Sequence, residues 1–401
     1  REIRRHAIRS ESSRSLNAMV SVASTEAEVC VMSSRLDDDP WLFNVANGTL
    51  DLRTGKISDH DRTDYITKTS PIEWRVDAQC PLWDKFILEA MEGDEEVVEF
   101  LHRFFGYCLT GLVSEQCLLF MEGTGCNGKT TALLLLMHIL GDYAIQGAPG
   151  LLMSKQNESH PTEVADLEGA RFVANAEVEK GKPFAEALIK QLTGSDPVRA
   201  RRMRQDFYQF EPTHKLCIAA NHRPIIKGND EGIWRRVIRI PWRRRIPESE
   251  KDMFFVDKLK EEAPGILARL VEGCLMWQKN GLNPPETVTL ATAEYRDEMD
   301  VLSEYMEDRC VIGKGQRVIK KQLYLDYAEW CEDMLQRPQN YSLFNRQLSE
   351  RDFQSKVTSM MVNGTRKSVR VWEGISLRRF SVPDSPSEAL AKSMGWSDIE
   401  A

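Results

Sequence analysis

The 401-residue sequence lacks the marks of several protein classes. Its nine cysteines include no C-x-x-C pair and its seven histidines form no cluster with ligand-like spacing, so neither a disulfide framework nor a zinc site is predicted. No segment resembles a secretion signal, and no apolar run approaches the roughly 18 residues that a membrane span needs. The sequence therefore indicates no membrane partner, and we expect a reducing compartment such as the cytoplasm.

Acidic residues outnumber basic ones, and the formal net charge is -8. Such an excess argues against a nucleic-acid partner if the charges are evenly spread. Between residues 199 and 245, however, 13 residues are basic and 4 are acidic. A basic segment inside an acidic chain predicts a local binding site for a polyanion.

The most informative motif is Gly-Thr-Gly-Cys-Asn-Gly-Lys-Thr at residues 123–130, which matches the full G-x-x-x-x-G-K-[ST] template of a phosphate-binding loop. An apolar run at 117–121 precedes the motif and a helical pattern at 131–140 follows it, which is the strand, loop, helix order that the template requires. The N–H groups of such a loop and the positive end of the helix dipole both face the phosphates. A chance glycine-rich turn before a core helix is the alternative interpretation.

The motif also predicts individual roles in a nucleoside triphosphatase. We expect Lys129 to contact the terminal phosphates and Thr130 to hold Mg²⁺. The predicted nucleotide-binding residues are Gly123, Thr124, Gly125, Cys126, Asn127, Gly128, Lys129, Thr130 and Thr131.

Two further apolar segments end in polar residues that suit triphosphate hydrolysis. Residues 171–176 predict a core strand that leads to Glu177 and Glu179, and we expect Glu177 to activate water or bind Mg²⁺ with Glu179 assisting. Residues 216–220 predict a buried strand that ends at Asn221, whose amide suits a contact to the terminal phosphate or its attacking water. Solvated strand-end carboxylates and a turn-forming asparagine are the competing interpretations.

Two adjacent arginines, Arg235 and Arg236, precede a predicted strand at 237–240. An arginine in this position is placed to project to a subunit boundary and neutralise charge on a neighbouring subunit's nucleotide. The alternative is an ion pair with Asp230 or Glu231 on the same surface.

Residues 196–210 combine arginines with aromatic residues. As two strands with a tip near residues 203–206, this segment would present cations to phosphates and aromatic rings to bases. A solvated basic face is the alternative. The predicted DNA-binding residues are Arg199, Arg201, Arg202, Arg204 and Phe207.

Composition and periodicity predict a division into several parts. We expect a linker or the end of a missing upstream part at 1–38, an accessory module at 39–115, an α/β motor at 116–246, a helical segment at 247–299, a winged-helix-like domain at 300–384 and a loose tail at 385–401.

The winged-helix-like domain is predicted from helices at 318–330 and 350–361, followed by a hairpin of strands 369–371 and 375–377. Such domains contact duplex DNA, bind proteins or brace a ring. The residues that we expect at a duplex are Arg351, Gln354, Lys356, Arg366, Lys367 and Arg370.

Several motifs in the same order resemble those of superfamily 3 helicases, most closely the helicase half of phage and plasmid primase-helicases, which is related to the poxvirus primase-helicase. The likeness runs through nearly the whole chain and includes the phosphate loop. The other matching segments are NGTLDLRTG at 47–55, FGYCLTG at 105–111, LIKQLTG at 188–194, NHRP at 221–224 and DEGIWRR at 230–236. The implied fold is an α/β AAA+ P-loop ATPase core with an α-rich N-terminal accessory module, or helical collar, and a C-terminal helical and winged-helix domain.

The resemblance implies an ATP-driven and Mg²⁺-dependent replicative helicase that forms a hexameric ring of identical subunits and moves 3′ to 5′ on single-stranded and forked DNA. It implies Asn221 as sensor, Arg236 as the arginine that acts in trans, and residues 202–204 as lining the channel. The acidic motif is Glu-Val-Glu at 177–179 rather than two adjacent acids, which leaves the roles of the two glutamates open.

The sequence begins at Arg1 rather than at a methionine, so we expect a fragment from which an upstream primase domain is missing. The primase active site of the resembling proteins has no match in these residues. Two other functions fit the same motifs: an ATP-switched, origin-binding replication initiator, and a P-loop motor for packaging or restriction that hydrolyses ATP without separating strands.

Overall fold

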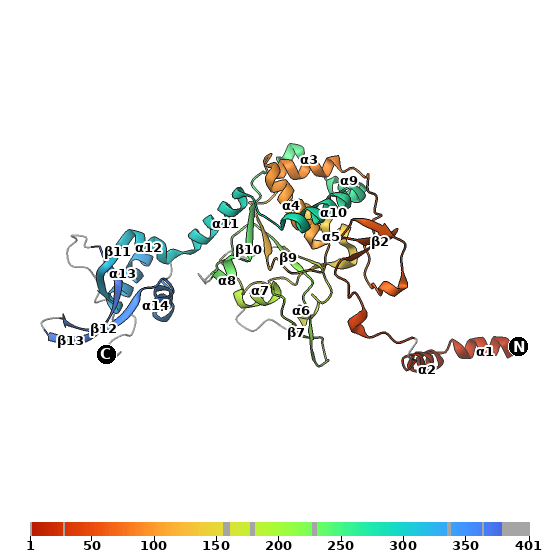
Figure 1. Ribbon diagram of the computed structural model, residues 1–401, viewed down its shortest axis with the longest axis horizontal. Coiled ribbons are helices and arrows are strands. Elements are labelled where there is room, and N and C mark those ends of the chain that lie inside the picture. The colour runs from red at the N-terminus through yellow and green to blue at the C-terminus, as the bar shows by residue number, and fades with distance from the viewer. Residues whose placement is uncertain are drawn as a thin grey trace. The chain divides into compact units, whose positions relative to one another are not determined.

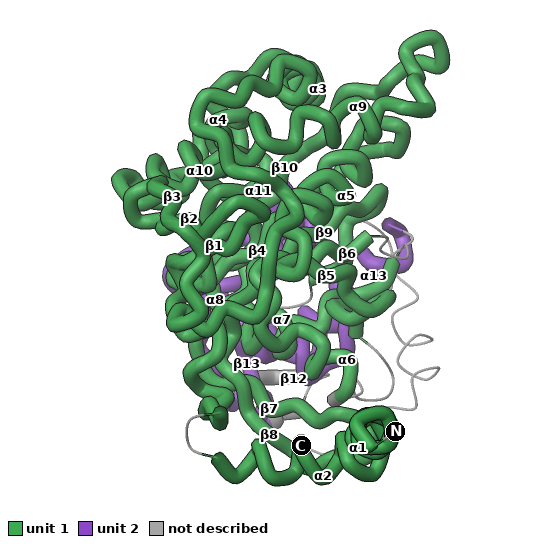
Figure 2. The backbone as a smooth tube through the Cα atoms, turned by 90° about the vertical axis from the view of Figure 1, so that its right-hand side faces the viewer, with its two compact units in different colours: residues 1–293 green, residues 294–401 purple. Residues whose placement is uncertain are grey.

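A computed structural model describes residues 2–26, 29–154, 161–176, 181–226, 231–334, 338–362 and 365–378. The chain forms two compact units, residues 1–293 and 294–401 (Figure 2). The predicted accessory module, motor and most of the helical segment all fall in the first unit, where one hydrophobic core cluster extends from Phe43 to Val288.

A five-stranded parallel sheet forms the centre of the first unit, with the strand order β10-β4-β9-β6-β5 (Figure 1). The strands are nearly continuous apolar runs, as expected for a parallel sheet buried on both faces. Their bounds are β4 Leu118–Glu122, β5 Ala144–Gln146, β6 Phe172–Ala176, β9 Lys215–Ala220 and β10 Val237–Pro241.

Four helices connect these strands or follow from them: α5 Lys129–Leu140, α6 Pro161–Ala165, α7 Glu186–Leu192 and α8 Glu231–Trp234. A separate antiparallel pair, β7 Val198–Arg201 and β8 Phe207–Phe210, lies between α7 and β9 in the chain. The structure thus confirms the apolar strands expected on both sides of the phosphate loop and the two-stranded form of the basic segment.

The region before the motor begins with helices α1 Glu2–Ser10 and α2 Ser13–Ala23 and continues with a three-stranded antiparallel sheet. Its strands are β1 Leu42–Val45, β2 Gly48–Asp51 and β3 Lys56–Ser58, and they are joined at the turn signals Asn47-Gly48 and Thr54-Gly55. Helices α3 Pro81–Ala90 and α4 Glu95–Cys108 follow.

Helices from both ends of the first unit pack on each other beside the sheet. The segment after the motor contains α9 Phe255–Glu261, α10 Ala263–Asn280 and α11 Glu286–Met299. Helices α4 and α10 make close contact because Gly106 and Gly273 lie at their crossing. A Cβ atom on Gly106 would stand 2.3 Å from the backbone nitrogen of Cys274, so a larger residue would force the two helices apart.

The second unit contains helices and a three-stranded antiparallel sheet of order β11-β13-β12. Its elements are α12 Val301–Arg309, β11 Cys310–Ile319, α13 Lys320–Asp333, α14 Tyr341–Glu350, β12 Gln354–Val362 and β13 Thr365–Leu377. Tyr305, Tyr327, Phe344 and Trp372 are buried in its separate core.

Two predictions for this unit are wrong. The helix expected at 350–361 is mainly strand β12, which pairs with β13 from Gln354 onward. The segments 369–371 and 375–377 belong to one continuous strand, β13, in which Gly374 has a positive φ of 93° and no hairpin turn is formed. Buried Val371, Trp372 and Ile375 fix this strand against the core.

Candidate nucleotide site

The phosphate loop lies at the carboxyl end of the central strand β4 and leads directly into helix α5. Two loop residues, Gly125 and Gly128, have positive φ angles of 91° and 88°, which glycine adopts without strain. A Cβ atom on Gly123 would stand 2.2 Å from the side chain of Asn127, so the first glycine is also needed for close packing. The conformation agrees with the sequence template at its two glycines, Gly123 and Gly128.

Lys129 and Asn221 meet above the carboxyl edge of the sheet. Lys129 is 4% exposed, and its Nζ donates to the carbonyl oxygen of Gly123 at 2.8 Å and to Asn127 Oδ1 at 2.9 Å. A longer contact of 3.4 Å joins Nζ to Asn221 Oδ1 at the end of β9. Burial lowers the pKa of Lys129 to about 8.

These residues line a cavity of about 540 Å³. Its walls include the phosphate loop, Thr130, Ala176 and Asn221. Ala176, the last residue of β6, lies in the cavity wall and is followed in the sequence by Glu177. Glu177 and Glu179 themselves lie outside the described residues, as does Asp230. Within the described part of the chain, no group of three or more His, Cys, Asp or Glu residues is arranged to hold a metal ion.

The segment after β10 holds the loop in shape. Asn127 Nδ2 donates to the carbonyl oxygen of Trp242 at 3.1 Å, and the Trp242 indole N–H donates back to the Asn127 carbonyl. The Ile246 N–H donates to the carbonyl oxygen of Cys126 at 2.7 Å. The loop is therefore braced by residues more than a hundred positions later, which the motif alone does not predict.

Glu122, the last residue of β4, is a second feature that the sequence interpretation missed. It is only partly exposed and accepts hydrogen bonds from Arg223 at 2.7 Å and from Arg239 at 2.5 Å. Arg223 belongs to the Asn-His-Arg-Pro segment that Asn221 opens. The ion pair thus ties the end of β9 to the start of the phosphate loop and fixes the direction of that segment.

The two adjacent arginines face different surroundings. Arg236 is 8% exposed, and its Nε donates to Thr193 Oγ1 at 3.0 Å. Its guanidinium also donates to the Gly232 carbonyl, so Arg236 joins two of the recognised motifs inside one chain. Arg235 is exposed. Arg236 is therefore buried whereas Arg235 is exposed, a difference that the sequence of two adjacent arginines does not reveal.

The basic hairpin β7–β8 presents arginines stacked on aromatic rings. The guanidinium groups of Arg199 and Arg201 lie 4.3 and 4.9 Å from the ring centroid of Phe207, which is half exposed. Arg202 instead pairs with Glu168 at 2.8 Å. Arg204 is exposed in the connecting turn, with a φ of 60°. All five predicted DNA-binding residues are on the hairpin, but Arg202 has a partner in its own chain.

Some of the residues expected at a DNA duplex also form ion pairs within the chain. Arg351 pairs with Asp300 on the same unit, and Lys356 pairs with Glu373 at 2.5 Å. Gln354 and Arg370 lie on paired strands rather than on an exposed helix. The side chains of Arg366 and Lys367 lie outside the described part. Arg351, Gln354 and Lys356 therefore do not share the helix on which the sequence placed them.

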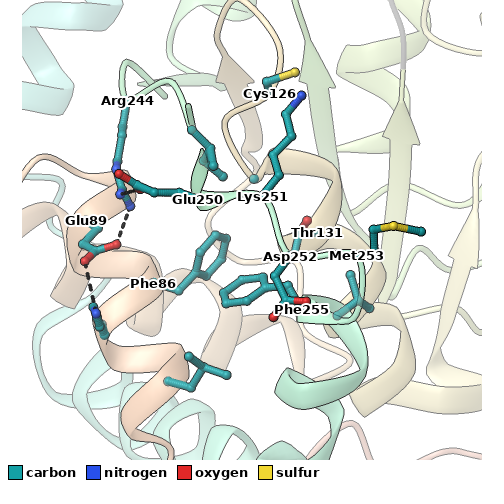
Figure 3. Close-up of a pocket in the computed structure, with 15 residues that line it drawn as sticks. Phe86, Glu89, Cys126, Thr131, Arg244, Glu250, Lys251, Asp252, Met253 and Phe255 are labelled. Carbon is teal, nitrogen blue, oxygen red and sulfur yellow. Dashed lines mark hydrogen bonds and ion pairs between the residues drawn. The ribbon is translucent and has the colours of Figure 1, made fainter. Parts of the chain in front are cut away.

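A second cavity, of about 730 Å³, shares Cys126, Gly128 and Thr131 with the phosphate cavity but does not include Lys129 or Asn221 (Figure 3). Phe86 of α3 and Phe255 of α9 lie edge to face in it, with ring centroids 5.4 Å apart. Its remaining apolar lining consists of Leu82, Ile246, Met253 and Val256. Its charged lining consists of Lys85, Glu89, Arg244, Glu250, Lys251 and Asp252.

Comparisons with known proteins find two family matches and similar viral proteins. Residues 1–92 match a family described as "D5 N terminal like", and residues 121–236 match a family of unknown function. The protein named "Putative helicase L207/L206" of Acanthamoeba polyphaga mimivirus is 29% identical over 321 residues, which are 74% of this chain and 33% of that protein. "Putative primase C962R" of African swine fever virus is 24% identical over 360 residues, 82% of this chain and 37% of the relative. "Putative helicase 022R" of Frog virus 3 is 23% identical over 378 residues, 74% of this chain and 39% of the relative.

The chain spans about a third of the length of the curated relatives that it matches. Among solved structures, the C-terminal region of NrS-1 aligns with a TM-score of 0.48 and 12% identity, over 76% of this chain and 79% of that one. Among the described helices, none combines the length and the apolar character needed to cross a bilayer.

The fold and the site define a mixed α/β protein with a phosphate loop at the carboxyl edge of a parallel sheet. The chain is similar to proteins named putative helicase and putative primase of large DNA viruses, and together with the D5 N terminal like match these similarities support a relationship to the D5-like primase-helicase family.

Proposed function

We propose that the chain is the ATP-driven motor of a replicative DNA helicase, built on an AAA+ core. The observation that carries this proposal is the contact of 3.4 Å between Lys129 Nζ and Asn221 Oδ1 beside the phosphate loop. The strand order supports it, because β9 with Asn221 lies between the phosphate-loop strand β4 and strand β6, which leads to Glu177. Lys129 and Asn221 therefore meet at the edge of the sheet where β6 also ends, as a hydrolytic site of this kind requires.

Each part has a role in this proposal. Lys129 binds the terminal phosphates, and Asn221 orients the terminal phosphate or the attacking water. Thr130 and Glu177 hold the Mg²⁺ ion, which when bound neutralises charge on the phosphate oxygens. Glu179 assists Glu177 with the water.

The arginine that acts in trans is Arg235 in this proposal. Charge stabilisation of a neighbour's nucleotide requires a guanidinium that reaches out of its own chain. Arg235 is exposed, whereas Arg236 is buried and bound to Thr193. Arg236 then has a supporting role, since its hydrogen bonds fix the turn from which Arg235 projects.

The basic hairpin is the proposed contact to DNA, and hexameric rings that move 3′ to 5′ along a strand are the proposed working form. Figure 1 shows β7 at the end of a narrow projection from the first unit. Arg199 and Arg201 stacked on Phe207 offer both cations for phosphates and an aromatic face for a base. We also propose that the assembled motor separates the strands of duplex DNA and works with a primase part upstream.

Mixing two inactive variants tests the shared site. Lys129→Ala removes the phosphate contact, and Arg235→Ala removes the trans contact while leaving ATP binding intact. Each variant alone is expected to lose ATP hydrolysis, and mixtures are expected to regain part of it because some boundaries then carry both intact residues. Arg243→Ala, which changes an exposed arginine elsewhere in the same basic segment, is the control. No recovery at any mixing ratio would overturn the shared-site proposal.

A further inference from the structure

The two faces of the basic hairpin β7–β8 differ in character. Successive side chains of a strand point to opposite faces, and the register pairs Ala200 with Tyr208 and Arg201 with Phe207. The outer face carries the cations and the stacked ring, and its residues are Arg199, Arg201, Phe207 and Gln209. The inner face is largely buried, and its residues are Val198, Ala200, Tyr208 and Phe210.

One carboxylate oxygen joins the inner face to the rest of the unit. Glu168 Oε2 accepts hydrogen bonds from Arg202 Nη2 at 2.8 Å and from the Tyr208 hydroxyl at 2.9 Å. Arg202 directly follows β7 and Tyr208 lies in β8, so this single atom holds both strands. The Arg202 guanidinium also lies 5.9 Å from the centroid of the Tyr208 ring. We call these three side chains the hairpin clamp.

The turn that carries Glu168 leads into strand β6. It occupies residues 166–169, directly after α6, which lies beside β7 (Figure 1). Leu167 and Ala170 are buried and fix the turn in the core. Thr213, which follows β8, donates from Oγ1 to the Ala170 carbonyl at 2.7 Å, so the base of the hairpin is bound there too. β6 begins two residues after Ala170 and ends in the wall of the phosphate cavity.

The exposure of the clamp indicates a role other than stability. The side chains of Arg202 and Glu168 are 60% and 38% exposed, and ion pairs at such positions contribute little to the stability of a fold. Burial of Val198, Ala200 and Phe210 already holds the hairpin on the unit. What the clamp adds is a fixed orientation of the projecting hairpin relative to the turn before β6.

We propose that Glu168 is a positioning residue that couples the DNA-contacting hairpin to strand β6. This inference rests on the proposed function, because it assumes that the outer face contacts DNA and that β6 leads to the glutamates of the hydrolytic site. Arg202 is then an anchor rather than a DNA contact. With the clamp intact, a movement of the turn before β6 moves the hairpin. Without it, the outer face still binds DNA but no longer follows the nucleotide.

Glu168→Ala in the full chain tests the coupling. We expect ATP hydrolysis without DNA to remain within about twofold of that of the unmodified chain. The stimulation of hydrolysis by a single-stranded oligonucleotide is expected to fall about tenfold or more. Asp166→Ala is the matched control, because Asp166 is also acidic and exposed and lies in the same turn. Full stimulation of Glu168→Ala by DNA would overturn the proposal.

The salt dependence of binding shows what Arg202 contacts. We expect Glu168→Ala and Asp166→Ala to bind the oligonucleotide with equal affinity and with the same slope against salt concentration. Each additional phosphate contact makes that slope steeper by about one unit. A slope steeper by about one unit in Glu168→Ala alone would show that the clamp withholds Arg202 from DNA, and it would overturn the assignment of Arg202 as an anchor.

An exchange of charges distinguishes coupling from a general structural effect. Glu168→Arg and Arg202→Glu are each expected to lose the stimulation by DNA. The double variant is expected to regain at least half of it, because the ion pair is restored in the reverse direction. No recovery in a double variant that melts at the same temperature as the unmodified chain would contradict the clamp.

Hydrogen exchange measures the coupling without DNA. Mg²⁺-ATP is expected to slow amide exchange at residues 198–210 of the unmodified chain and to leave exchange there unchanged in Glu168→Ala, although both chains bind ATP. An equal response of the two chains would overturn the inference while leaving the proposed function intact. If the unmodified chain binds neither ATP nor DNA, the proposed function is wrong and the inference fails with it.

Discussion

The two edges of the central sheet both gather cationic side chains, but they use them differently. At the carboxyl edge, Lys129 faces an open cavity, and its hydrogen bonds are to groups that a phosphate can replace. At the amino edge, Arg171 directly precedes β6 and Lys215 is the first residue of β9. Both side chains are buried in the protein. The same residue chemistry therefore prepares a binding site at one edge and an internal joint at the other.

The internal joint ties the accessory helices to the motor. Arg171 donates to the carbonyl oxygens of Leu109 at 2.6 Å and Leu42 at 2.8 Å, and Lys215 donates to the Thr110 carbonyl. Leu109 and Thr110 follow directly after α4, where the carbonyls at a helix end need donors and the helix dipole favours a cation. This explains why residues 39–115 share a core with the motor instead of forming a separate unit.

The largest expected effect is on ATP affinity and comes from a substitution at the carboxyl edge. Lys129→Ala removes the charge that faces the phosphates, and we expect ATP affinity to fall by about 100-fold or more, in line with the loss of a desolvated charge pair. Thermal stability should change little, because the two shortest described hydrogen bonds of Lys129 are to Gly123 and Asn127 within the phosphate loop itself. Calorimetric titration with ATP measures the first effect and a melting curve the second. Lys56→Ala, an exposed change in β3, is the control.

At the amino edge we expect the opposite result, a loss of stability without a loss of ATP affinity. Arg171→Met keeps much of the side-chain volume but leaves the carbonyls of Leu42 and Leu109 without donors, so we expect a loss of about 3 kcal/mol in the free energy of unfolding. ATP affinity in the folded variant should remain within about twofold. Chemical denaturation measures the stability. A variant as stable as the unmodified chain would show that the joint is not needed for folding.

Lys215 gives an effect on stability that depends on pH. Burial lowers its pKa from 10.5 to about 7 in the folded chain. Between these two values the unfolded chain retains a proton that the folded chain has lost, so this lysine makes stability rise as pH increases from about 7 to 10.5. Lys215→Met should remove that part of the rise. Denaturation curves across this pH range test the expectation, and an unchanged slope in the variant would contradict it.

The sequence was sufficient where a motif and its apolar flanks described local structure. Three strands were predicted correctly: the one before the phosphate loop, the one before Glu177 and the one before Asn221. Each is a short apolar run that ends in a polar group. The contact of Phe86 with Gly128 was missed, since it joins positions 42 apart in the chain and no local pattern encodes it.

The second unit shows where periodicity fails. Residues 354–362 have apolar side chains at spacings that suit either a helix or a strand, and only pairing with β13 decides for the strand. The difference between Arg235 and Arg236 has the same origin. Which of two adjacent side chains is buried depends on how the turn before β10 packs against Thr193, a residue of another element.

Strand separation on a forked DNA substrate tests the central claim most directly. With ATP and Mg²⁺, the full chain is expected to unwind the fork, whereas Asn221→Ala is expected to bind ATP about as well as the unmodified chain and to unwind nothing. That result follows if Asn221 acts on the terminal phosphate or its attacking water rather than holding the nucleotide. Normal unwinding by Asn221→Ala would contradict the account.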